Sequence, residues 1–165
     1  MRILGIDPGT ATTGYGMIMQ NEDEYKALSF GCITTKAGLP LEQRLQEIAN
    51  DLVAIIKKTK PDEAAIEEIF FSKNVKTAIS VAHARGVIIH TLQQNNIPIQ
   101  SYNPMQIKKA ICSDGSANKT QIQKMTQLLL QLETIPTPDD AADALAIAIC
   151  HGNHIRNNSL YQKAA

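Results

Sequence analysis

The chain has 165 residues, 44% of them hydrophobic, which is enough for one globular domain with its own core and without disulfides. Its three cysteines form no CxxC pair, which excludes the common cysteine-based zinc and redox motifs. No apolar run approaches the ~20 residues needed to span a bilayer, and the N-terminus begins as a strand rather than as a signal sequence. We therefore expect a soluble cytoplasmic protein without membrane association. Residues 1–157 form its single domain, and residues 158–165 a polar, frayed tail.

The formal net charge is zero, but the charges are unevenly distributed. Residues 69–130 carry seven basic side chains and one acidic side chain, whereas the rest of the chain carries nine basic and fifteen acidic ones. This asymmetry predicts that the middle of the chain faces a polyanion. Lysines on solvated helix faces are the alternative explanation for part of the excess.

The first half of the chain reads as three strands followed by a helix. Apolar residues predict strands over 2–7, 13–20 and 24–36, and the short connections between them indicate an antiparallel meander. Apolar residues then recur at helical spacing from Leu41 to Lys58, and Pro61 closes that helix.

The second half alternates strands and helices. A strand over 62–70, a long helix over 73–96 and a strand over 97–102 have the order of a βαβ unit, which places parallel strands in the same sheet. We therefore expect a mixed sheet in an α/β fold.

Three helices complete the chain. A short helix after Pro104 carries Lys108, and a second helix runs from about Asn118 to Leu132. The last helix follows Thr137, which is a natural N-cap, with Pro138 at the first helical position.

Acidic residues lie at the ends of apolar segments in three places. They are Asp7 after the first strand, Glu67 or Glu68 after the fourth, and Asp139, Asp140 and Asp143 in the last helix. Partly desolvated carboxylates repel one another, which is costly unless a cation compensates them. Because neither a cysteine pair nor a histidine at ligand spacing accompanies them, an all-oxygen site for Mg²⁺ or Mn²⁺ is favoured over zinc.

Spacing leaves two of these choices open. Asp143 shares a helical face with both Asp139 and Asp140, and either of those two can instead serve the helix N-terminus as a cap or a dipole partner. Strand alternation sends Glu67 and Glu68 to opposite faces, but both faces of an inner strand are covered.

Four segments, in this order, resemble the bacterial RuvC-type Holliday-junction resolvases: "GIDPGTATTGYG", "AIEEIFFSKN", "ARGVIIHTL" and "DDAADALAIAICH". The resemblance extends from about Ile3 to His151. It implies a ribonuclease H-like fold, with a five-stranded mixed sheet, helices on both faces and the first three strands antiparallel. It also implies a homodimer that cuts a four-way DNA junction symmetrically, with a branch-migration helicase complex as partner. The long helix over 75–94 is the expected dimer contact.

The resemblance also assigns site residues. The catalytic and metal-binding acids fall on Asp7, Glu67, Asp140 and Asp143, where two Mg²⁺ ions are expected and Mn²⁺ is a possible substitute. The expected DNA contacts are Phe70, with Lys73 beside it, and Lys108 and Lys119. Taken alone, each lysine is also compatible with a solvated surface position, and Phe70 and Phe71 with the core. The histidines at 83, 90, 151 and 154 are expected to be structural or at the surface.

Three other functions are compatible with parts of this pattern. A different nuclease of the same fold, acting on RNA/DNA hybrids or flaps, would use the same acids. An actin-like nucleotide-binding protein also has an aspartate and glycines after its first strand, but it needs two lobes. A noncatalytic DNA-binding module would explain the basic middle of the chain but not the acidic residues.

Overall fold

The computed structural model describes residues 1–22, 24–69 and 75–164. Its strands are β1 (Arg2–Asp7), β2 (Thr12–Asn21), β3 (Glu24–Thr34), β4 (Glu63–Glu67) and β5 (Ile99–Tyr102). They form one sheet in the order β3-β2-β1-β4-β5. The pairs β1/β2 and β2/β3 are antiparallel, and the pairs β1/β4 and β4/β5 are parallel. The expectation of a mixed sheet with an antiparallel first half is confirmed.

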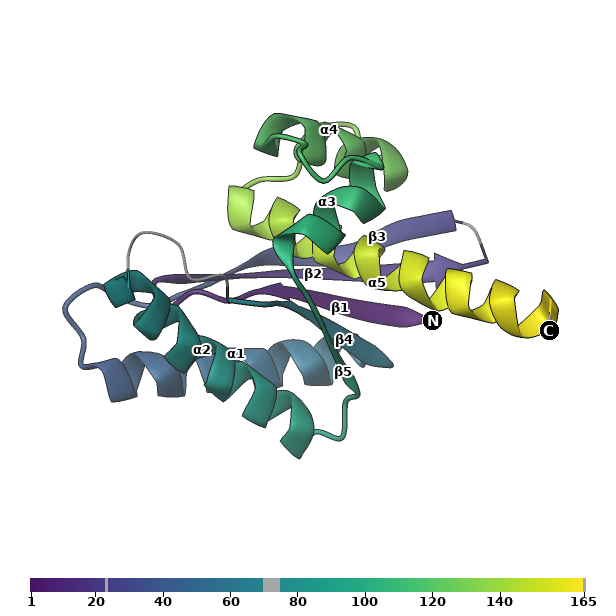
Figure 1. Cartoon of the computed structure of the whole chain (residues 1–165). Helices are drawn as coiled ribbons and strands as arrows, with labels where there is room; N and C mark the ends of the chain where they lie inside the picture. Colours follow the sequence, from purple (N-terminus) through teal and green to yellow (C-terminus); the bar gives the residue numbers. More distant parts are fainter. Residues whose placement is uncertain (23, 70–74, 165) are drawn as a thin grey trace.

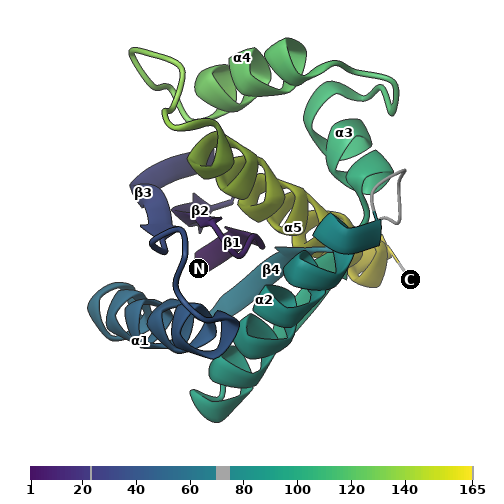
Figure 2. The ribbon, with the colours of Figure 1, turned by 90° about the vertical axis from the view of Figure 1, so that its left-hand side faces the viewer.

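Helices cover both faces of this sheet (Figure 1). α1 (Leu41–Thr59) and α2 (Val75–Gln94) lie on one face, and α5 (Asp139–Ala164) lies on the other, beneath α3 (Pro104–Cys112) and α4 (Lys119–Leu129). Figure 2 shows the two helical layers on opposite sides of the strands. Each layer has its own apolar cluster. Leu4 and Ile6 of β1 face α1 and α2, whereas Ile3 faces α5. Strand alternation therefore builds two cores from one strand.

Local sequence signals set the ends of the two short helices. Asn103 caps α3, where its side chain accepts a hydrogen bond from the backbone N–H of Gln106 and the Gln106 side chain accepts one from the backbone N–H of Asn103. Asn118 and Gln121 form the same capping box at the start of α4. Each pair satisfies backbone donors that the first helical turn leaves free.

Glycines let α5 lie directly on the sheet. A Cβ atom on Gly5 would lie 2.0 Å from the carbonyl oxygen of Ala144, and one on Gly14 would lie 2.0 Å from that of Asp140. Both positions therefore require glycine, because any side chain would push the helix away. This close approach carries the first turns of α5 to the ends of β1 and β2.

The start of α5 differs from the expected one. The helix begins at Asp139, and the carbonyl oxygen of Pro138 accepts the first backbone hydrogen bonds, from Ala141 at 3.0 Å and Ala142 at 3.3 Å. Pro138 thus precedes the helix instead of occupying its first position, and Thr137 does not cap it. Beyond residue 157, where a frayed tail was expected, α5 continues to Ala164. Within the described residues, no helix has the length and apolarity needed to cross a membrane.

Candidate active site

Asp7 and Glu67 end two neighbouring parallel strands at the same edge of the sheet. Ile6 of β1 is paired with Ile66 of β4, so the next residue on each strand lies beside its counterpart. The side chains of Asp7 and Glu67 are close enough for each to act on the pKa of the other. A hydrogen bond between two carboxyl groups requires a proton on one of them.

The α5 helix brings two further carboxylates to this edge. Asp140 and Asp143 are both partly buried, and each acts electrostatically on Asp7. They lie three residues apart on the helix, so they project from the same side of it. Four acidic side chains from three elements therefore share one end of the sheet.

Burial and mutual repulsion disfavour the charged forms of these acids. Burial, together with the carboxylates of Glu67, Asp143 and Asp140, raises the pKa of Asp7 to about 8. Burial and the charge of Asp143 also raise the pKa of Glu67, and burial raises that of Asp143. The cluster is thus short of positive charge, and a cation placed among the acids would stabilise it.

Lys119 supplies one positive charge at the rim of the cluster. Its ammonium nitrogen lies 3.3 Å from Asp143 Oδ2 and 3.1 Å from Asp139 Oδ2. Asp139 also accepts a hydrogen bond from Gln123 at 3.0 Å. These contacts raise the pKa of Lys119 despite the opposing effect of burial, so the ammonium group stays charged.

A pocket of about 210 Å³ opens beside the acids. Its walls come from β4, α3, α4 and α5, and its polar lining side chains are Glu67, Lys108, Lys119 and Asp143. Apolar residues of α3 and α5, including Ile107 and Ile147, complete it. The pocket combines carboxylates and ammonium groups in its lining, an arrangement that suits a phosphate group bound next to a cation.

The tertiary structure distinguishes the residues that spacing could not. Glu68 lies beyond the end of β4, is exposed and lines a different pocket together with Asn103. Asp139 is exposed and ion-paired with Lys119, whereas Asp140 lies against β2 at Gly14. Glu67 and Asp140 are therefore the members of each pair that lie with Asp7.

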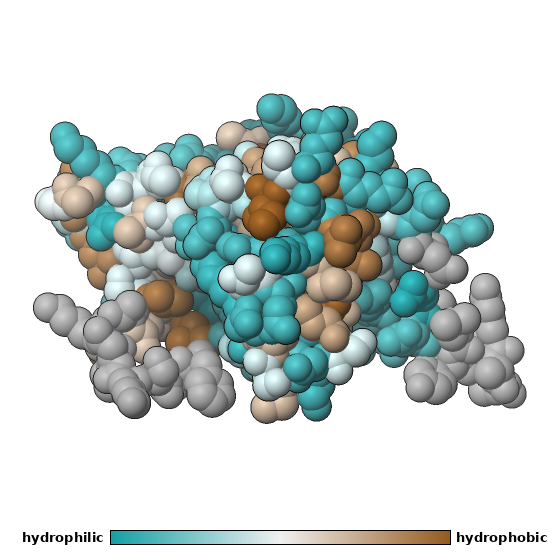
Figure 3. All heavy atoms as spheres, turned by 90° about the horizontal axis from the view of Figure 1, so that it is seen from above, coloured by the Kyte–Doolittle hydropathy of each residue, from teal (hydrophilic) through white to brown (hydrophobic). Residues whose placement is uncertain are grey.

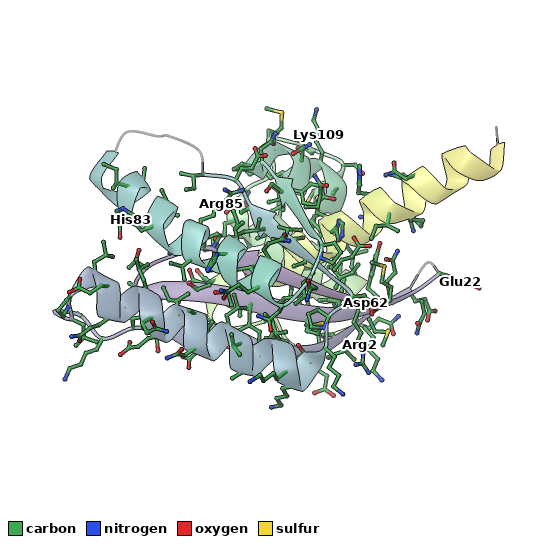
Figure 4. The ribbon with its side chains drawn as sticks, turned by 90° about the horizontal axis from the view of Figure 1, so that it is seen from below. Arg2, Glu22, Asp62, His83, Arg85 and Lys109 are labelled. Carbon is green, nitrogen blue, oxygen red and sulfur yellow. The ribbon has the colours of Figure 1, made fainter. Side chains whose placement is uncertain are left out.

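Arg85 is a neighbour of the cluster that the sequence pattern did not indicate. It points from α2 toward the sheet (Figure 4), and its Nε donates to the backbone carbonyl of Glu67 at 3.1 Å. Its Nη2 donates to Ser101 Oγ at 2.8 Å. Arg85 thus holds the main chain at Glu67 from the α2 face. The signal that could have indicated it is a basic residue within a helix whose neighbours on that face are apolar.

The expected DNA contacts are only partly described. Lys108 and Lys119 both line the pocket beside the acids, whereas Phe70 and Lys73 lie outside the described residues. The face over α3 and α4 is mostly hydrophilic, with separate apolar patches (Figure 3). Exposed apolar side chains on these helices include Met105 and Leu128. Among the histidines, 83, 90 and 154 are exposed at the surface, and 151 is buried within the fold.

The donor chemistry of the cluster fits a hard divalent cation. Its ligands would all be carboxylate oxygens, which Mg²⁺ and Mn²⁺ prefer, and the raised pKa of Asp7 reflects burial first and the neighbouring carboxylates second. Within the described part of the chain, no three histidine, cysteine, aspartate or glutamate side chains are already arranged to hold a metal ion.

Comparisons with known proteins identify the family of the chain. Residues 3–151 match the family model described as "Crossover junction endodeoxyribonuclease RuvC". The chain is 52% identical over 151 residues to a protein of that name from Chloroflexus aurantiacus, covering 92% of each chain. It is 48% identical over 165 residues to the one from Syntrophomonas wolfei, covering 100% of this chain and 96% of the relative.

A solved structure shows the same fold. The structure of Thermus thermophilus RuvC in complex with Holliday junction substrate superposes with a TM-score of 0.90 at 30% identity, covering 96% of each chain. The fold is therefore the ribonuclease H-like fold of that protein, as expected, and the family implies use of a divalent metal. The chain belongs to the RuvC family of crossover junction endodeoxyribonucleases.

Proposed function

We propose that this protein is a structure-selective endonuclease that resolves four-way (Holliday) DNA junctions by hydrolysing phosphodiester bonds in recombination and repair. The observation that supports this most directly is the group of four acids from β1, β4 and α5 beside a pocket lined by Lys108 and Lys119. The match of residues 3–151 to a family of crossover junction endodeoxyribonucleases also supports this proposal.

The acids are proposed to bind the catalytic ions. Asp7, which interacts with all three other acids, is the expected shared ligand, and Glu67, Asp140 and Asp143 complete the set. We propose two Mg²⁺ ions, with Mn²⁺ as a substitute. When bound, such ions activate a water molecule and neutralise charge on the phosphate and on the leaving oxygen.

The lysines have a separate role in this proposal. Lys119 is paired with Asp143 and Asp139, and a phosphodiester at the pocket would offer it further anionic oxygens as acceptors. Lys108, on the α3 side of the pocket, would bind a second phosphate oxygen. Both would stabilise negative charge that grows during hydrolysis. Phe70 and Lys73 stay as predicted DNA contacts.

Symmetric cutting requires two active sites at a fixed separation, so we also propose a homodimer. The exposed face of α2 is the candidate contact, and its Ile79 side chain is 52% exposed. A branch-migration helicase complex remains the proposed partner, and the cytoplasm, where bacterial DNA is located, the proposed compartment.

The test is cleavage of defined DNA substrates. A synthetic four-way junction, a linear duplex and an RNA/DNA hybrid are incubated with the protein in Mg²⁺ or in EDTA. We expect symmetric nicks in the junction alone, only with Mg²⁺, and loss of cleavage in Asp7→Asn. Asp51→Asn, an exposed position on α1, removes the same charge elsewhere and should cut normally. Equal cutting of the hybrid would favour a different nuclease of this fold.

A further inference from the structure

A hydrogen-bonded chain of two buried side chains and one side chain that is 35% exposed, Glu63, lies away from the acidic cluster. The hydroxyl of Tyr102 lies 2.8 Å from His151 Nδ1, and His151 Nε2 lies 2.8 Å from Glu63 Oε2. Tyr102 is 3% exposed and His151 is 4% exposed. Burying such polar groups is favourable only when their hydrogen bonds are made. We call these three side chains the Glu63–His151–Tyr102 relay.

The relay has one consistent arrangement of protons. Burial lowers the pKa of His151 despite the opposing effect of Glu63, which favours a neutral ring. In a neutral ring that serves both partners, Nε2–H donates to the Glu63 carboxylate and Nδ1 accepts from the Tyr102 hydroxyl. Burial also raises the pKa of Tyr102, so its hydroxyl keeps its proton, and that hydroxyl is occupied by the hydrogen bond to His151. The role of the relay is therefore one of position.

The relay joins the elements that carry the acids. Glu63 is the first residue of β4 and Glu67 is the last. Tyr102 of β5 is paired with Glu67, and the backbone N–H of Glu68 donates to its carbonyl oxygen at 2.9 Å. His151 follows Asp143 by about two turns of α5. The first residue of β4, Glu63, is thus hydrogen-bonded to α5, the helix that carries Asp143 about two turns earlier.

The Asn153 side chain of α5 donates to the carbonyl oxygen of Ala110 in α3 at 3.0 Å, and two further side-chain hydrogen bonds to this part of α5 come from other strands. Tyr25 of β3 donates to Asn153 Oδ1 at 2.8 Å, and Gln20 of β2 donates to the carbonyl oxygen of Gly152 at 3.0 Å. These contacts hold α5 against the antiparallel half of the sheet. The relay holds α5 against β4. It therefore affects the distance between Glu67 of β4 and Asp143 of α5.

We propose that the Glu63–His151–Tyr102 relay positions the α5 carboxylates relative to Glu67 and thereby sets the divalent-ion affinity of the acidic cluster. This rests on the proposed role of that cluster in binding metal. The three residues are positioning residues, because none of them reaches the acids. A small displacement of two carboxylates weakens ion binding more than it destabilises the fold, because Mg²⁺ coordination tolerates less displacement than side-chain packing does.

The test is Mg²⁺ binding to the full chain without DNA, measured by titration calorimetry. Tyr102→Phe removes the hydroxyl of the relay with little change in shape, and His151→Leu removes both hydrogen bonds. We expect each variant to weaken Mg²⁺ binding about threefold to tenfold. This is less than the 10- to 100-fold loss typical for residues that hydrogen-bond directly to a metal-coordinating side chain. His151→Gln can accept from Tyr102 and donate to Glu63, so its affinity should return to within about twofold of the original.

A matched control separates this role from general loosening of α5. Tyr25→Phe also removes a tyrosine hydroxyl that bonds to α5, but from β3. It should leave Mg²⁺ affinity unchanged even if it lowers the melting temperature as much as Tyr102→Phe does. Equal weakening by both tyrosine variants, or unchanged affinity in Tyr102→Phe, would overturn the proposal.

Two further readouts complete the design. If His151→Leu does not fold, the pair Glu63→Gln and Glu63→Leu replaces it, because glutamine keeps an acceptor for His151 and leucine does not. Junction cleavage by Tyr102→Phe should reach the original rate when Mg²⁺ is saturating. If the unmodified protein binds no Mg²⁺, the proposed function of the acidic cluster fails. If it binds Mg²⁺ and the relay variants bind it equally well, only the relay proposal fails.

Discussion

The ammonium nitrogen of Lys119 lies 3.3 Å from a carboxylate oxygen of Asp143, so a basic residue of α4 is in direct contact with an acid of the cluster. If the ammonium group of Lys119 contacts the scissile phosphate during the reaction, Lys119→Met should slow junction cleavage by at least about tenfold. This corresponds to ~1.4 kcal/mol of transition-state stabilisation. Single-turnover rates at saturating Mg²⁺ measure this effect.

Lys124→Met is the control for Lys119→Met, because Lys124 is an exposed lysine on the same helix. The Lys119 side chain is 53% exposed, so water screens both of its ion pairs. Losing these ion pairs in Lys119→Met should change the free energy of unfolding by no more than about 0.5 kcal/mol. Equal loss of rate in both variants would reduce Lys119 to a general contributor of charge.

The acidic cluster predicts an unusual pH dependence of stability without metal. The folded-state pKa of Asp7 is about 8, above its ordinary value of 3.8, so the folded state holds a proton that the unfolded state releases. This stabilising contribution is complete below about pH 4 and is lost as pH rises through 8. In EDTA, we expect urea unfolding to show lower stability at pH 8 than at pH 5, by a few kcal/mol at most.

Asp7→Asn tests the origin of this pH dependence. Asparagine stays neutral, so the variant should lose most of the decline between pH 5 and pH 8 and should be more stable than the unmodified protein in EDTA at pH 8. Saturating Mg²⁺ should reduce the decline in the unmodified protein, because ion binding favours the charged folded state. A decline of the same size in Asp7→Asn would assign it to other groups.

Gly14 predicts a steric effect that reaches the site. A Cβ atom there would lie 2.0 Å from the carbonyl oxygen of Asp140, so Gly14→Ala should displace α5, destabilise the fold by about 1–3 kcal/mol and impair cleavage. Gly86→Ala is the matched control, because a Cβ on Gly86 meets no atom within 4 Å. Since Gly86 lies in the interior of α2, that change should be neutral or should stabilise by up to about 1 kcal/mol in urea unfolding.

The proposed dimer contact is tested at Ile79. Replacing this half-exposed side chain with arginine would place a charge in the contact, and we expect Ile79→Arg to weaken dimerisation at least about tenfold. Sedimentation equilibrium measures the dissociation constant. Leu128→Arg, at a 68% exposed position on α4, makes the same kind of change outside α2 and should leave it unaltered. Dimerisation that survives Ile79→Arg would point to a different interface.

The elements themselves were accessible from the sequence because their signals are local. The helical spacing of apolar residues over 41–58 predicted α1, and the apolar run before Asp7 predicted β1. The start of α5 was predicted incorrectly because Thr137 and Pro138 form a good capping sequence, yet the helix begins at Asp139. The sequence pattern predicts a helix start near residue 138, but it does not determine which residue accepts the first helical hydrogen bond.

Neighbours contributed by distant segments were not accessible in this way. Arg85 reaches the carbonyl of Glu67 from α2, and His151 reaches Glu63 across the helix–sheet interface. Neither contact follows from spacing, since each depends on how two layers pack. His151 is buried, in line with the expected structural position, but its partners Tyr102 and Glu63 could be identified only from the structure.

By itself, the sequence determined the order and type of the elements, the presence of acids at the ends of apolar segments and the family to which the chain belongs. It did not determine from spacing whether Glu67 or Glu68, or Asp139 or Asp140, lies beside Asp7. The parallel register of β1 with β4 decided the first choice, and the close approach of α5 at Gly14 decided the second. Periodicity and capping act over a few residues, whereas these carboxylates meet through pairing and packing between segments far apart in the chain.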